Sequence, residues 1–364
     1  MSNSPPESVT FVGQRTEALL GSMIHAETQR WLHQDERLGE GVQLLANMVM
    51  GRGKRLRAAF VYWSWVGASG WLGVATDDDA EVLNACAAFE LLQAFALIHD
   101  DIMDDAATRR GIPTIHTAQA ERLAAQGWRG EPRRYGEGVA ILLGDLAHVY
   151  ADRCMTHANV YSRQLWDELR IELNLGQYLD IRSSAAGDAD RSTAQAVATF
   201  KSALYTIVRP LQMGATMATG WAALQPSARE VALQRLEDFG RPLGQAFQLR
   251  DDLLGVLGDT DNTGKPVGGD LQEGKATELL SVALERANPS QNALLARVGR
   301  MLLSPDEIAS IVGVLHETGA VAEIEQRIDS LIAQANAAIP TLRVDPSTQA
   351  TMSELARYVG KRTH

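Results

Sequence analysis

The sequence contains few cysteine and aromatic residues, and it lacks segments typical of secreted or membrane proteins. Only two of its 364 residues are Cys, and aromatic residues make up 6%. Cys86 and Cys154 lie in apolar helical stretches, which predicts buried thiols and a reducing, cytoplasmic environment. The N-terminus is polar and has no apolar signal region. No uninterrupted apolar run reaches about 18 residues, so we expect no transmembrane helix.

Motifs of several other protein classes are also missing. A net charge of −11 argues against a nucleic-acid binder whose affinity depends on a broad basic surface. Residues 51–54 place glycines before a lysine, but a Walker phosphate loop needs a longer glycine spacing and a following Ser or Thr. His99 and His116 have no accompanying Cys/His set with zinc-ligand spacing, so we expect structural or supporting roles for both.

The apolar residues that are present predict an all-α protein. Hydrophobic residues make up 45% of the chain, mostly Ala, Leu and Val, and they show little strict alternation. We find no internal repeat and no linker that would split the chain. The sequence therefore predicts one all-α domain over residues 1–364, with a disordered tail of about ten residues at the N-terminus.

The most informative segment is an apolar helix that ends in carboxylates. Residues 82–103 have the pattern of a buried helix, and Asp100, Asp101 and Asp104 lie at its end. On a helix, residues three and four apart share a face, so these side chains converge. Buried like charges are costly unless a cation neutralises them, and Mg²⁺ is usually held by carboxylates and substrate phosphates. The alternative is a solvated acidic helix end.

A second acidic pair favours the metal hypothesis. Residues 248–255 again place two aspartates, Asp251 and Asp252, towards the end of an apolar helical stretch. Two such pairs on two buried helices suggest a shared cavity, with metal bound between its facing walls.

Basic residues follow glycines or accompany the first acidic group. Lys54, Arg55 and Arg57 lie at the expected start of a helix, where free N–H groups and the helix dipole favour an anion. The alternative is a solvated basic helix end. Arg109 and Arg110 lie in a loop close to the first acids, and arginine binds phosphate through two hydrogen bonds.

Three lysines further along the chain are also candidates for phosphate binding. Lys201 lies within a largely apolar helix expected over residues 193–220, where it could extend to solvent or point at a buried anion. Lys265 and Lys275 lie in a glycine-rich segment that we expect to close as a lid over phosphate.

These motifs, in this order and at these intervals, resemble those of the trans-isoprenyl diphosphate synthases, the polyprenyl synthetase family, along nearly the whole chain. The resemblance implies an isoprenoid synthase helical bundle around a deep central cavity, working as a homodimer. It also implies Mg²⁺-dependent, head-to-tail (1′-4) condensation of isopentenyl diphosphate with an allylic diphosphate. Within this family, the sequence most resembles the geranylgeranyl diphosphate synthases, because of the residues before the first aspartates that are described below.

The resemblance assigns roles to individual residues. Mg²⁺ would be held by Asp100, Asp104 and Asp251, with Asp101 and Asp252 in support. The residues expected around the allylic diphosphate are Arg109, Lys201, Gln248, Lys265 and Lys275, with Ser202 as a further substrate-binding candidate. The residues matching the isopentenyl diphosphate site are Lys54, Arg57, Gln93 and Arg110. The residues expected to act directly in catalysis are Asp100, Asp101, Asp104, Arg109, Lys201, Asp251 and Asp252.

The residue chemistry suits such a reaction. Breaking an allylic C–O bond releases pyrophosphate, whose charge several cations can stabilise. The carbocation must be shielded from water, which an apolar cavity below the metals would do. No nucleophilic Ser or Cys is required. As a hypothesis based on the family, the departing pyrophosphate takes the final proton.

Two positions depart from the family pattern. The second acidic motif often has a third Asp four residues after its first, and here that position is Gly255. We expect metal binding to persist, with a weaker or more hydrated shell. The first motif carries an extra acid, Asp105.

Product length is expected to depend on the residues before the first aspartates. Phe95 and Ala96 lie five and four residues before Asp100, about one turn deeper in the bundle. One aromatic at the fifth position with a small residue at the fourth resembles geranylgeranyl diphosphate synthases. Two aromatics would suggest a farnesyl product, and none a longer chain. The alternative is that Phe95 belongs to the ordinary core.

Other functions account for fewer of the motifs. A class I terpene cyclase uses a single diphosphate and has no reason to keep a second anion site. An inactive subunit of a heteromeric synthase would be expected to lose aspartates, and only Gly255 suggests such a loss. A metal-buffering helical protein would explain the carboxylates but not the paired cations.

Overall fold

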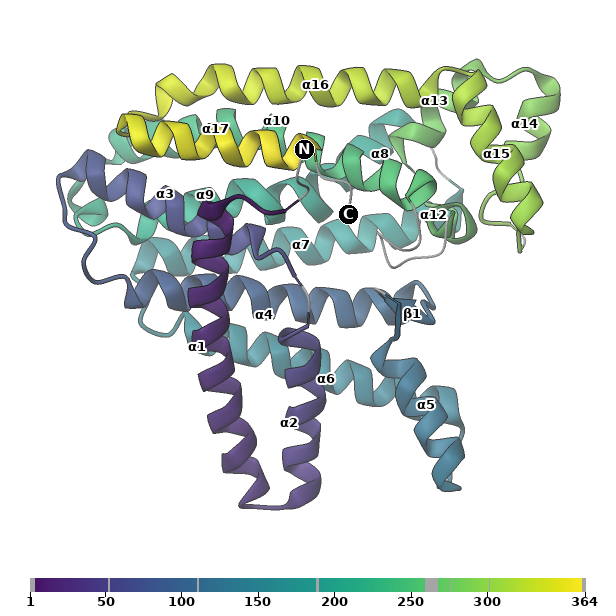
Figure 1. The fold of residues 1–364 in the computed structure, drawn as a ribbon, viewed down its shortest axis with the longest axis horizontal. Helices are drawn as coiled ribbons and strands as arrows, with labels where there is room; N and C mark the ends of the chain where they lie inside the picture. Colours follow the sequence, from purple (N-terminus) through teal and green to yellow (C-terminus); the bar gives the residue numbers. More distant parts are fainter. Residues whose placement is uncertain are drawn as a thin grey trace. The chain divides into compact units, whose positions relative to one another are not determined.

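The computed structural model describes residues 4–51, 53–109, 111–187, 190–258, 268–275, 277–300 and 302–361. These residues are almost entirely helical, and their only strands are two segments of two residues each (Figure 1), so the expected all-α fold is confirmed. The contacts within the chain gather in two compact units. The organisation as one domain stays a prediction. Helix α1 begins at Glu7, within the segment for which we expected disorder.

The first unit, called here the N-terminal unit, comprises Pro5–Arg163 and Met213–Ala222. Its elements within the first segment are α1 (Glu7–Leu32), α2 (Glu36–Val49), α3 (Leu56–Leu72), α4 (Ala80–Met103), β1 (Thr108–Arg109), β2 (Ile112–Pro113), α5 (Ile115–Gln126) and α6 (Pro132–Cys154). The strands pair antiparallel, with Thr108 opposite Pro113 and Arg109 opposite Ile112. The first two helices form an antiparallel hairpin (Figure 1).

Helix α4 is the central helix of the N-terminal unit. It packs against α1, α2, α3, α5 and α6, and its apolar side chains, such as Phe89, Leu92 and Ile98, are buried among them. By length and hydropathy this helix could cross a membrane, contrary to the expectation that no helix would qualify, but 61% of its apolar window is buried within the structure. It therefore has the environment of a core helix, with the first acidic group at its C-terminal end.

The second unit, called here the C-terminal unit, comprises Met1–Ser4, Gln164–Gln212 and Ala223–His364. Helices α7 (Val160–Ala186), α9 (Arg209–Met217) and η2 (Trp221–Ala223) cross a boundary between units. Its remaining elements are α8 (Arg191–Val197), η1 (Ala198–Val208), α10 (Pro226–Leu257), α12 (Gly269–Glu273), α13 (Glu278–Arg286), α14 (Pro289–Leu295), α15 (Pro305–Glu317), α16 (Ala320–Ala338), η3 (Ile339–Leu342) and α17 (Pro346–Lys361).

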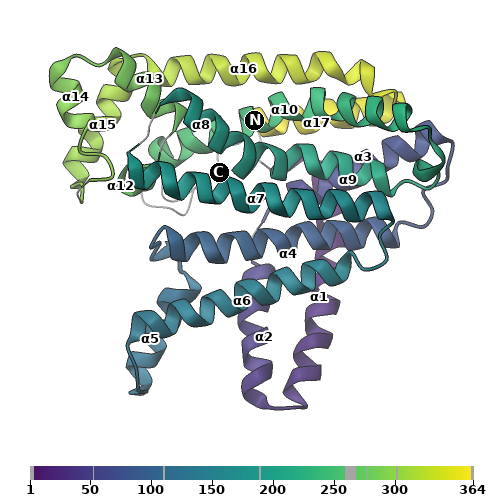
Figure 2. The ribbon, with the colours of Figure 1, turned by 180° about the vertical axis from the view of Figure 1, so that it is seen from behind.

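Helix α10 is the central helix of the C-terminal unit. It packs against η1, α12, α13, α16 and α17, and α16 runs beside it in both views (Figures 1 and 2). Leu249, Leu253 and Val256 on α10 are buried in a cluster with Leu271 of α12 and Ile324 of α16. The second acidic group, Asp251 and Asp252, therefore lies on a helix that is well packed within its own unit.

Several expected loops are helical. On sequence alone, the small and acidic residues over 67–79 favour a loop, but α3 continues to Leu72. On sequence alone, the Gly and Arg residues over 124–138 favour a mobile connection. In the structure α5 ends at Gln126 and α6 begins at Pro132, a residue favoured at a helix start. The helix expected over residues 193–220 is present, but it is divided among α8, the π-helix η1 and α9.

The two cysteines are free thiols, as their contexts suggested. Cys86 is buried, and burial raises its pKa. Cys154 is only partly buried by exposed area, and desolvation still raises its pKa to about 11.

Candidate active site

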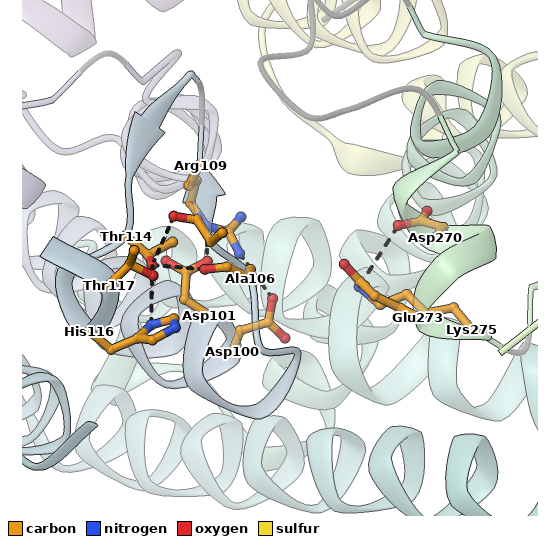
Figure 3. Close-up of polar contacts among 11 residues, drawn as sticks. Asp100, Asp101, Ala106, Arg109, Thr114, His116, Thr117, Asp270, Glu273 and Lys275 are labelled. Atoms are coloured by element: carbon orange, nitrogen blue, oxygen red, sulfur yellow. Dashed lines mark hydrogen bonds and ion pairs between the residues drawn. The ribbon is translucent and has the colours of Figure 1, made fainter. Parts of the chain in front are cut away.

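The first acidic group is bound by an arginine from the short hairpin that follows it (Figure 3). The Nε atom of Arg109 donates a hydrogen bond to Asp101 Oδ1 at 2.6 Å, and Nη2 donates to Asp100 Oδ2 at 3.2 Å. All three side chains are largely shielded from solvent. One guanidinium therefore offsets part of the charge of two carboxylates, and the expected proximity of Arg109 to these acids is observed.

Asp101 is the most buried member of this group. Burial raises its pKa above the ordinary value, although the adjacent Arg109 opposes that shift. His116 contributes a smaller favourable charge interaction, and its Nδ1 lies 3.2 Å from Thr114 Oγ1 (Figure 3). The Thr114 hydroxyl also donates to the Ala106 carbonyl oxygen at 2.8 Å. His116 thus belongs to the scaffold that holds the hairpin beside Asp101.

The remaining two acids of this segment have different environments. Asp104 caps the C-terminal end of α4, and its backbone N–H donates to the Asp100 carbonyl oxygen at 2.8 Å. Asp105 adopts a left-handed backbone conformation (φ 50°), is exposed, and lies 3.5 Å from Arg133 Nη2 of α6. The extra acid noted in the sequence therefore forms part of the helix ending and of a surface ion pair.

The basic residues at the start of α3 divide into one structural arginine, Arg55, and two candidates for anion binding, Lys54 and Arg57. Arg55 is buried, and its guanidinium contacts Glu90 at 2.8 Å, Glu17 at 3.1 Å and the Val49 carbonyl oxygen at 2.9 Å. The expectation that Arg55 strengthens an anion site was wrong, because its hydrogen bonds hold α1, α3 and α4 together.

The other candidates of this anion site lie in the same unit. Lys54 precedes α3, Arg57 lies in its first turn, and Gln93 lies on α4; each is partly buried. Arg110 lies outside the described residues.

The second acidic group combines a buried and a more exposed carboxylate on α10. Asp252 is buried and accepts a hydrogen bond at 2.7 Å from Nε2 of Gln248, one turn earlier. Burial raises its pKa well above the ordinary value, and the negative charges of Asp270 and Asp251 act in the same direction. Asp251 is only partly buried. This group gathers negative charge where a cation would be favoured.

The expected lid segment is described only in part. Lys275 Nζ lies 2.6 Å from Glu273 Oε2 and 3.9 Å from Asp270 Oδ1, beside the short helix α12 (Figure 3). Lys265 lies outside the described residues. Within the described part, Lys275 therefore lies among carboxylates on one side of the second acidic group.

Lys201 lies on the π-helix η1 and is held by an aspartate of α7. Its Nζ lies 2.5 Å from Oδ2 of Asp180, which is buried. The backbones approach closely here, because a Cβ added at Gly176 would lie 2.5 Å from Lys201 N. Ser202 follows Lys201 on the same segment and is partly buried. The site thus has a lysine whose ammonium is oriented by a carboxylate.

Phe95 contacts two imidazole rings. Its ring stacks on that of His148 from α6 at a centroid distance of 4.8 Å, and the edge of His99 approaches at 4.8 Å. His99 Nε2 lies 3.2 Å from the Ile141 carbonyl oxygen, which places His99 in the scaffold. Ala96, the adjacent small residue, is partly buried.

Comparison with known proteins identifies the family. A model described as polyprenyl synthetase matches residues 41–315. The chain belongs to the polyprenyl synthetase family. Together with the relatives described below, this family membership shows that the protein is a trans-prenyl diphosphate synthase, which is a prenyltransferase of isoprenoid biosynthesis.

The relatives of this polyprenyl synthetase differ in product. A geranylgeranyl diphosphate synthase of Mycobacterium tuberculosis is 34% identical over 291 residues, covering 77% of this chain and 74% of the relative. A geranylfarnesyl diphosphate synthase of Aeropyrum pernix is 28% identical over 326 residues, covering 87% and 92%. A crystal structure of geranylgeranyl pyrophosphate synthase from Corynebacterium glutamicum, complexed with isoprenyl diphosphate and magnesium, matches with a TM-score of 0.89, 34% identity and 99% of each chain covered.

The carboxylates of this polyprenyl synthetase fit a hydrated divalent cation. Each acidic group pairs a partly exposed carboxylate, Asp100 or Asp251, with a buried neighbour, Asp101 or Asp252. In the described ranges, no three His, Cys, Asp or Glu side chains gather as around a metal ion. Mg²⁺ binds through one or two carboxylates with waters and phosphate oxygens, so the donor set is of the right kind.

Three residues of the synthetase site were not assigned by sequence reasoning. Asp180 lies three residues after Gln177, a spacing that suggests no role by itself, and only the fold places Asp180 against Lys201. His148 could not be found from the sequence, because its partner Phe95 is distant in the chain. Asp270 could not be found either, because it lies against Gly255, which has no side chain to indicate a neighbour.

Proposed function

We propose that this protein is an Mg²⁺-dependent prenyltransferase that condenses isopentenyl diphosphate head-to-tail (1′-4) with an allylic diphosphate and produces geranylgeranyl diphosphate. The observation that carries the proposal is that each acidic group lies near the C-terminal end of its unit's central helix, and that a cation accompanies each group. Arg109 contacts the first group, and Lys275 is close enough to Asp252 for its positive charge to act there.

The metal-binding roles follow from exposure and chemistry. Asp100, Asp104 and Asp251 are partly exposed and would contact Mg²⁺, while the buried Asp101 and Asp252 would support them. When bound, Mg²⁺ would supply positive charge that stabilises the leaving diphosphate.

The substrate roles divide between two anion sites. The proposed allylic diphosphate site consists of Arg109, Lys201, Ser202, Gln248, Lys265 and Lys275. The proposed isopentenyl diphosphate site consists of Lys54, Arg57, Gln93 and Arg110. With this division, the allylic diphosphate can ionise at the first site. The second site holds isopentenyl diphosphate, so that its double bond is in position to attack.

Arg109 would have two successive roles. Without substrate, its guanidinium offsets part of the charge of Asp100 and Asp101. Once a diphosphate arrives, the same guanidinium can donate to phosphate oxygens, which compete well for its planar set of N–H groups. Asp180 would meanwhile keep the Lys201 ammonium oriented. The departing diphosphate would accept the proton released at the end of the reaction.

The proposed product length rests on Phe95 and on the relatives. Phe95 is almost fully buried and contacts two imidazole rings, so packing restrains the position of its ring. Relatives named geranylgeranyl diphosphate synthases support the C20 product. The geranylfarnesyl relatives make a longer product the alternative.

We also propose that the enzyme is a cytoplasmic homodimer. Helix α6 exposes Leu142 and Val149, seven residues apart, with 68% and 56% of their surface accessible. An apolar stripe at this spacing would be buried by a second copy. Light scattering combined with size-exclusion chromatography tests the dimer.

The experiment that tests the function is a prenyl transfer assay. The purified protein is incubated with Mg²⁺, labelled isopentenyl diphosphate and, in turn, dimethylallyl, geranyl or farnesyl diphosphate. We expect each starter to be elongated to a C20 diphosphate. A discrete product of another length would overturn the product assignment. Cyclic hydrocarbon release, or no elongation with any starter, would overturn the proposed transferase reaction.

A further inference from the structure

A polar groove lies in the C-terminal unit, where α8, α10 and α16 meet. Its volume is about 520 Å³, within the size range of small-molecule binding sites. One face of α16 forms its longest wall, because the lining positions of this helix recur at spacings of three and four residues. The polar side chains that matter below are Arg191 of α8, Gln245 of α10, and Gln326, Arg327, Ser330 and Gln334 of α16.

Two arginines of the groove share one buried carboxylate. Nε of Arg191 donates a hydrogen bond to Glu278 Oε1 at 3.0 Å, and Nη1 of Arg327 lies 2.6 Å from the same oxygen. Glu278 is buried at the start of α13, whereas both arginines are only partly buried. The shared carboxylate therefore holds the two guanidinium groups close together at the groove.

The ion-pair network around this carboxylate has more positive than negative groups. Nη2 of Arg191 also donates to Glu323 Oε1 at 3.2 Å, and Glu323 is paired with Arg286 as well. The network thus contains three guanidinium groups, of Arg191, Arg286 and Arg327, and two carboxylates. Each guanidinium has five N–H groups, more than these contacts use. Planar guanidinium groups of this kind suit phosphate oxygens.

The rest of the groove has the chemistry of a site for polar molecules. The amides of Gln245, Gln326 and Gln334 can each donate and accept hydrogen bonds, and Gln334 Nε2 donates to Ser330 Oγ at 3.3 Å. Among the described residues that line the groove, only Leu331 is apolar. A prenyl chain would cover these amides without replacing their hydrogen bonds to water, so the groove does not suit a prenyl diphosphate.

The groove is also separate from the candidate substrate sites. Gln245 precedes Asp251 by six residues, which places the two side chains about 120° apart around α10. Within the described part of the chain, the residues proposed for Mg²⁺, for the allylic diphosphate and for isopentenyl diphosphate do not line the groove. A ligand bound there would therefore occupy a different place from the substrates.

We propose that this groove is a second anion site, which binds a diphosphate group either as the free inorganic anion or on a small polar molecule. Arg191 and Arg327 donate to the phosphate oxygens, and the amides of Gln245 and Gln326 contact the polar remainder of the ligand. The inference goes beyond prenyl transfer and does not depend on it, since the site is separate and its ligand has no prenyl chain.

The test changes the charge of the groove without touching its buried ion pairs. Gln326 is exposed, so Gln326→Glu and Gln326→Lys should fold normally. Gln34→Glu and Gln34→Lys, at an exposed position between α1 and α2, are the matched controls. Binding of inorganic pyrophosphate and of ADP is measured by isothermal titration calorimetry in EDTA, without divalent cations. Circular dichroism and thermal unfolding check the fold of each variant.

We expect the wild type to bind at least one of the two probes. Affinity should fall by about 10-fold in Gln326→Glu and rise by a similar factor in Gln326→Lys, because a charge a few ångströms from a diphosphate acts strongly on it. Both Gln34 variants should match the wild type. Tighter binding of ADP would identify a polar molecule as the carrier of the diphosphate, and tighter binding of pyrophosphate would identify the free anion.

Two results would overturn the proposal. One is that neither probe binds, and the other is an affinity that does not depend on residue 326, which would place any binding at another site. The measurements need no turnover, so a failure of the proposed transferase reaction would appear separately, as wild-type protein that elongates no starter.

Discussion

The ring of Phe95 stacks on the imidazole of His148 with centroids 4.8 Å apart and planes inclined by 24°. Both residues lie in the N-terminal unit, on α4 and α6, whose packing brings them together. The ring of His99 also contacts that of Phe95, in a T-shaped arrangement with centroids 4.8 Å apart. A ring packed against two others cannot turn aside easily for a growing chain, so these contacts give a physical reason for Phe95 to limit product length.

Replacing Phe95 with Ala is expected to lengthen the product by one or more isoprene units, because the wall that blocks chain growth is removed. Products are separated by reversed-phase chromatography after removal of the diphosphate. Phe11→Ala, at an exposed ring on α1, is the matched control and should leave the distribution unchanged. An unchanged distribution in Phe95→Ala would place the limit elsewhere.

Replacing His148 with Ala is expected to shift the products in the same direction but less far. The Phe95 ring remains, but it loses its stacking partner and gains freedom to rotate. His148→Phe should preserve the stack and the product length. If His148→Ala and wild type give the same products while Phe95→Ala does not, Phe95 acts without this support.

The first acidic group allows a sharp comparison among neighbouring aspartates. Asp100→Ala and Asp104→Ala are each expected to lower turnover by about 10²-fold or more, since they remove groups that stabilise the developing charge. Asp105→Ala is the control, because Asp105 is exposed and faces Arg133. Initial rates and thermal unfolding are measured for all three. Retained activity in Asp100→Ala or Asp104→Ala would contradict the metal assignment.

The ion pair between Arg55 and Glu90 predicts a stability effect rather than a catalytic one. Both side chains are buried, and removing Glu90 leaves a buried charge, which typically costs about 3–5 kcal/mol. Glu90→Ala should therefore lower the free energy of unfolding by an amount near this range. Glu17→Ala is the matched control: it contacts the same guanidinium from a more exposed position and should cost less than about 1 kcal/mol. Urea titrations measure both, and equal losses would contradict this account.

Local sequence patterns were sufficient to predict most of the helices and the order of the motifs. The apolar period before Asp100 and the acids on α10 are visible without any structure, because helix burial follows residue spacing. The extent of α3 and the start of α6 were misjudged, since small and charged residues in those stretches are compatible with both helix and loop.

Relationships between distant segments could not be predicted from the sequence. Arg55 has the same local pattern as Lys54 and Arg57, and only packing against Glu90 shows that its charge is already used. The filling of the Gly255 space by Asp270 depends on how α12 packs, and a glycine gives no sign of what lies above it. Such contacts arise from tertiary structure, which one sequence does not specify residue by residue.

The final prediction concerns Asp180, which we expect to be a positioning residue acting through Lys201. Asp180→Asn keeps the size of the side chain but removes the charge that orients Lys201 Nζ at 2.5 Å. We expect kcat/KM for the allylic substrate to fall by about 10-fold or more, because a displacement of about 1 Å can cost 10²-fold in rate. Asp180→Glu should recover part of the loss. Glu172→Gln, which breaks another ion pair of α7, with Arg209, is the matched control and should change kcat/KM far less.

A double-mutant cycle separates this role from a general structural one. If Asp180 acts through Lys201, then Asp180→Asn has little further effect on kcat/KM in the Lys201→Met background, since the group that it orients is absent. Thermal unfolding of the four proteins checks that all are folded at the assay temperature. Equal losses from Asp180→Asn in both backgrounds would show that Asp180 acts on something other than Lys201.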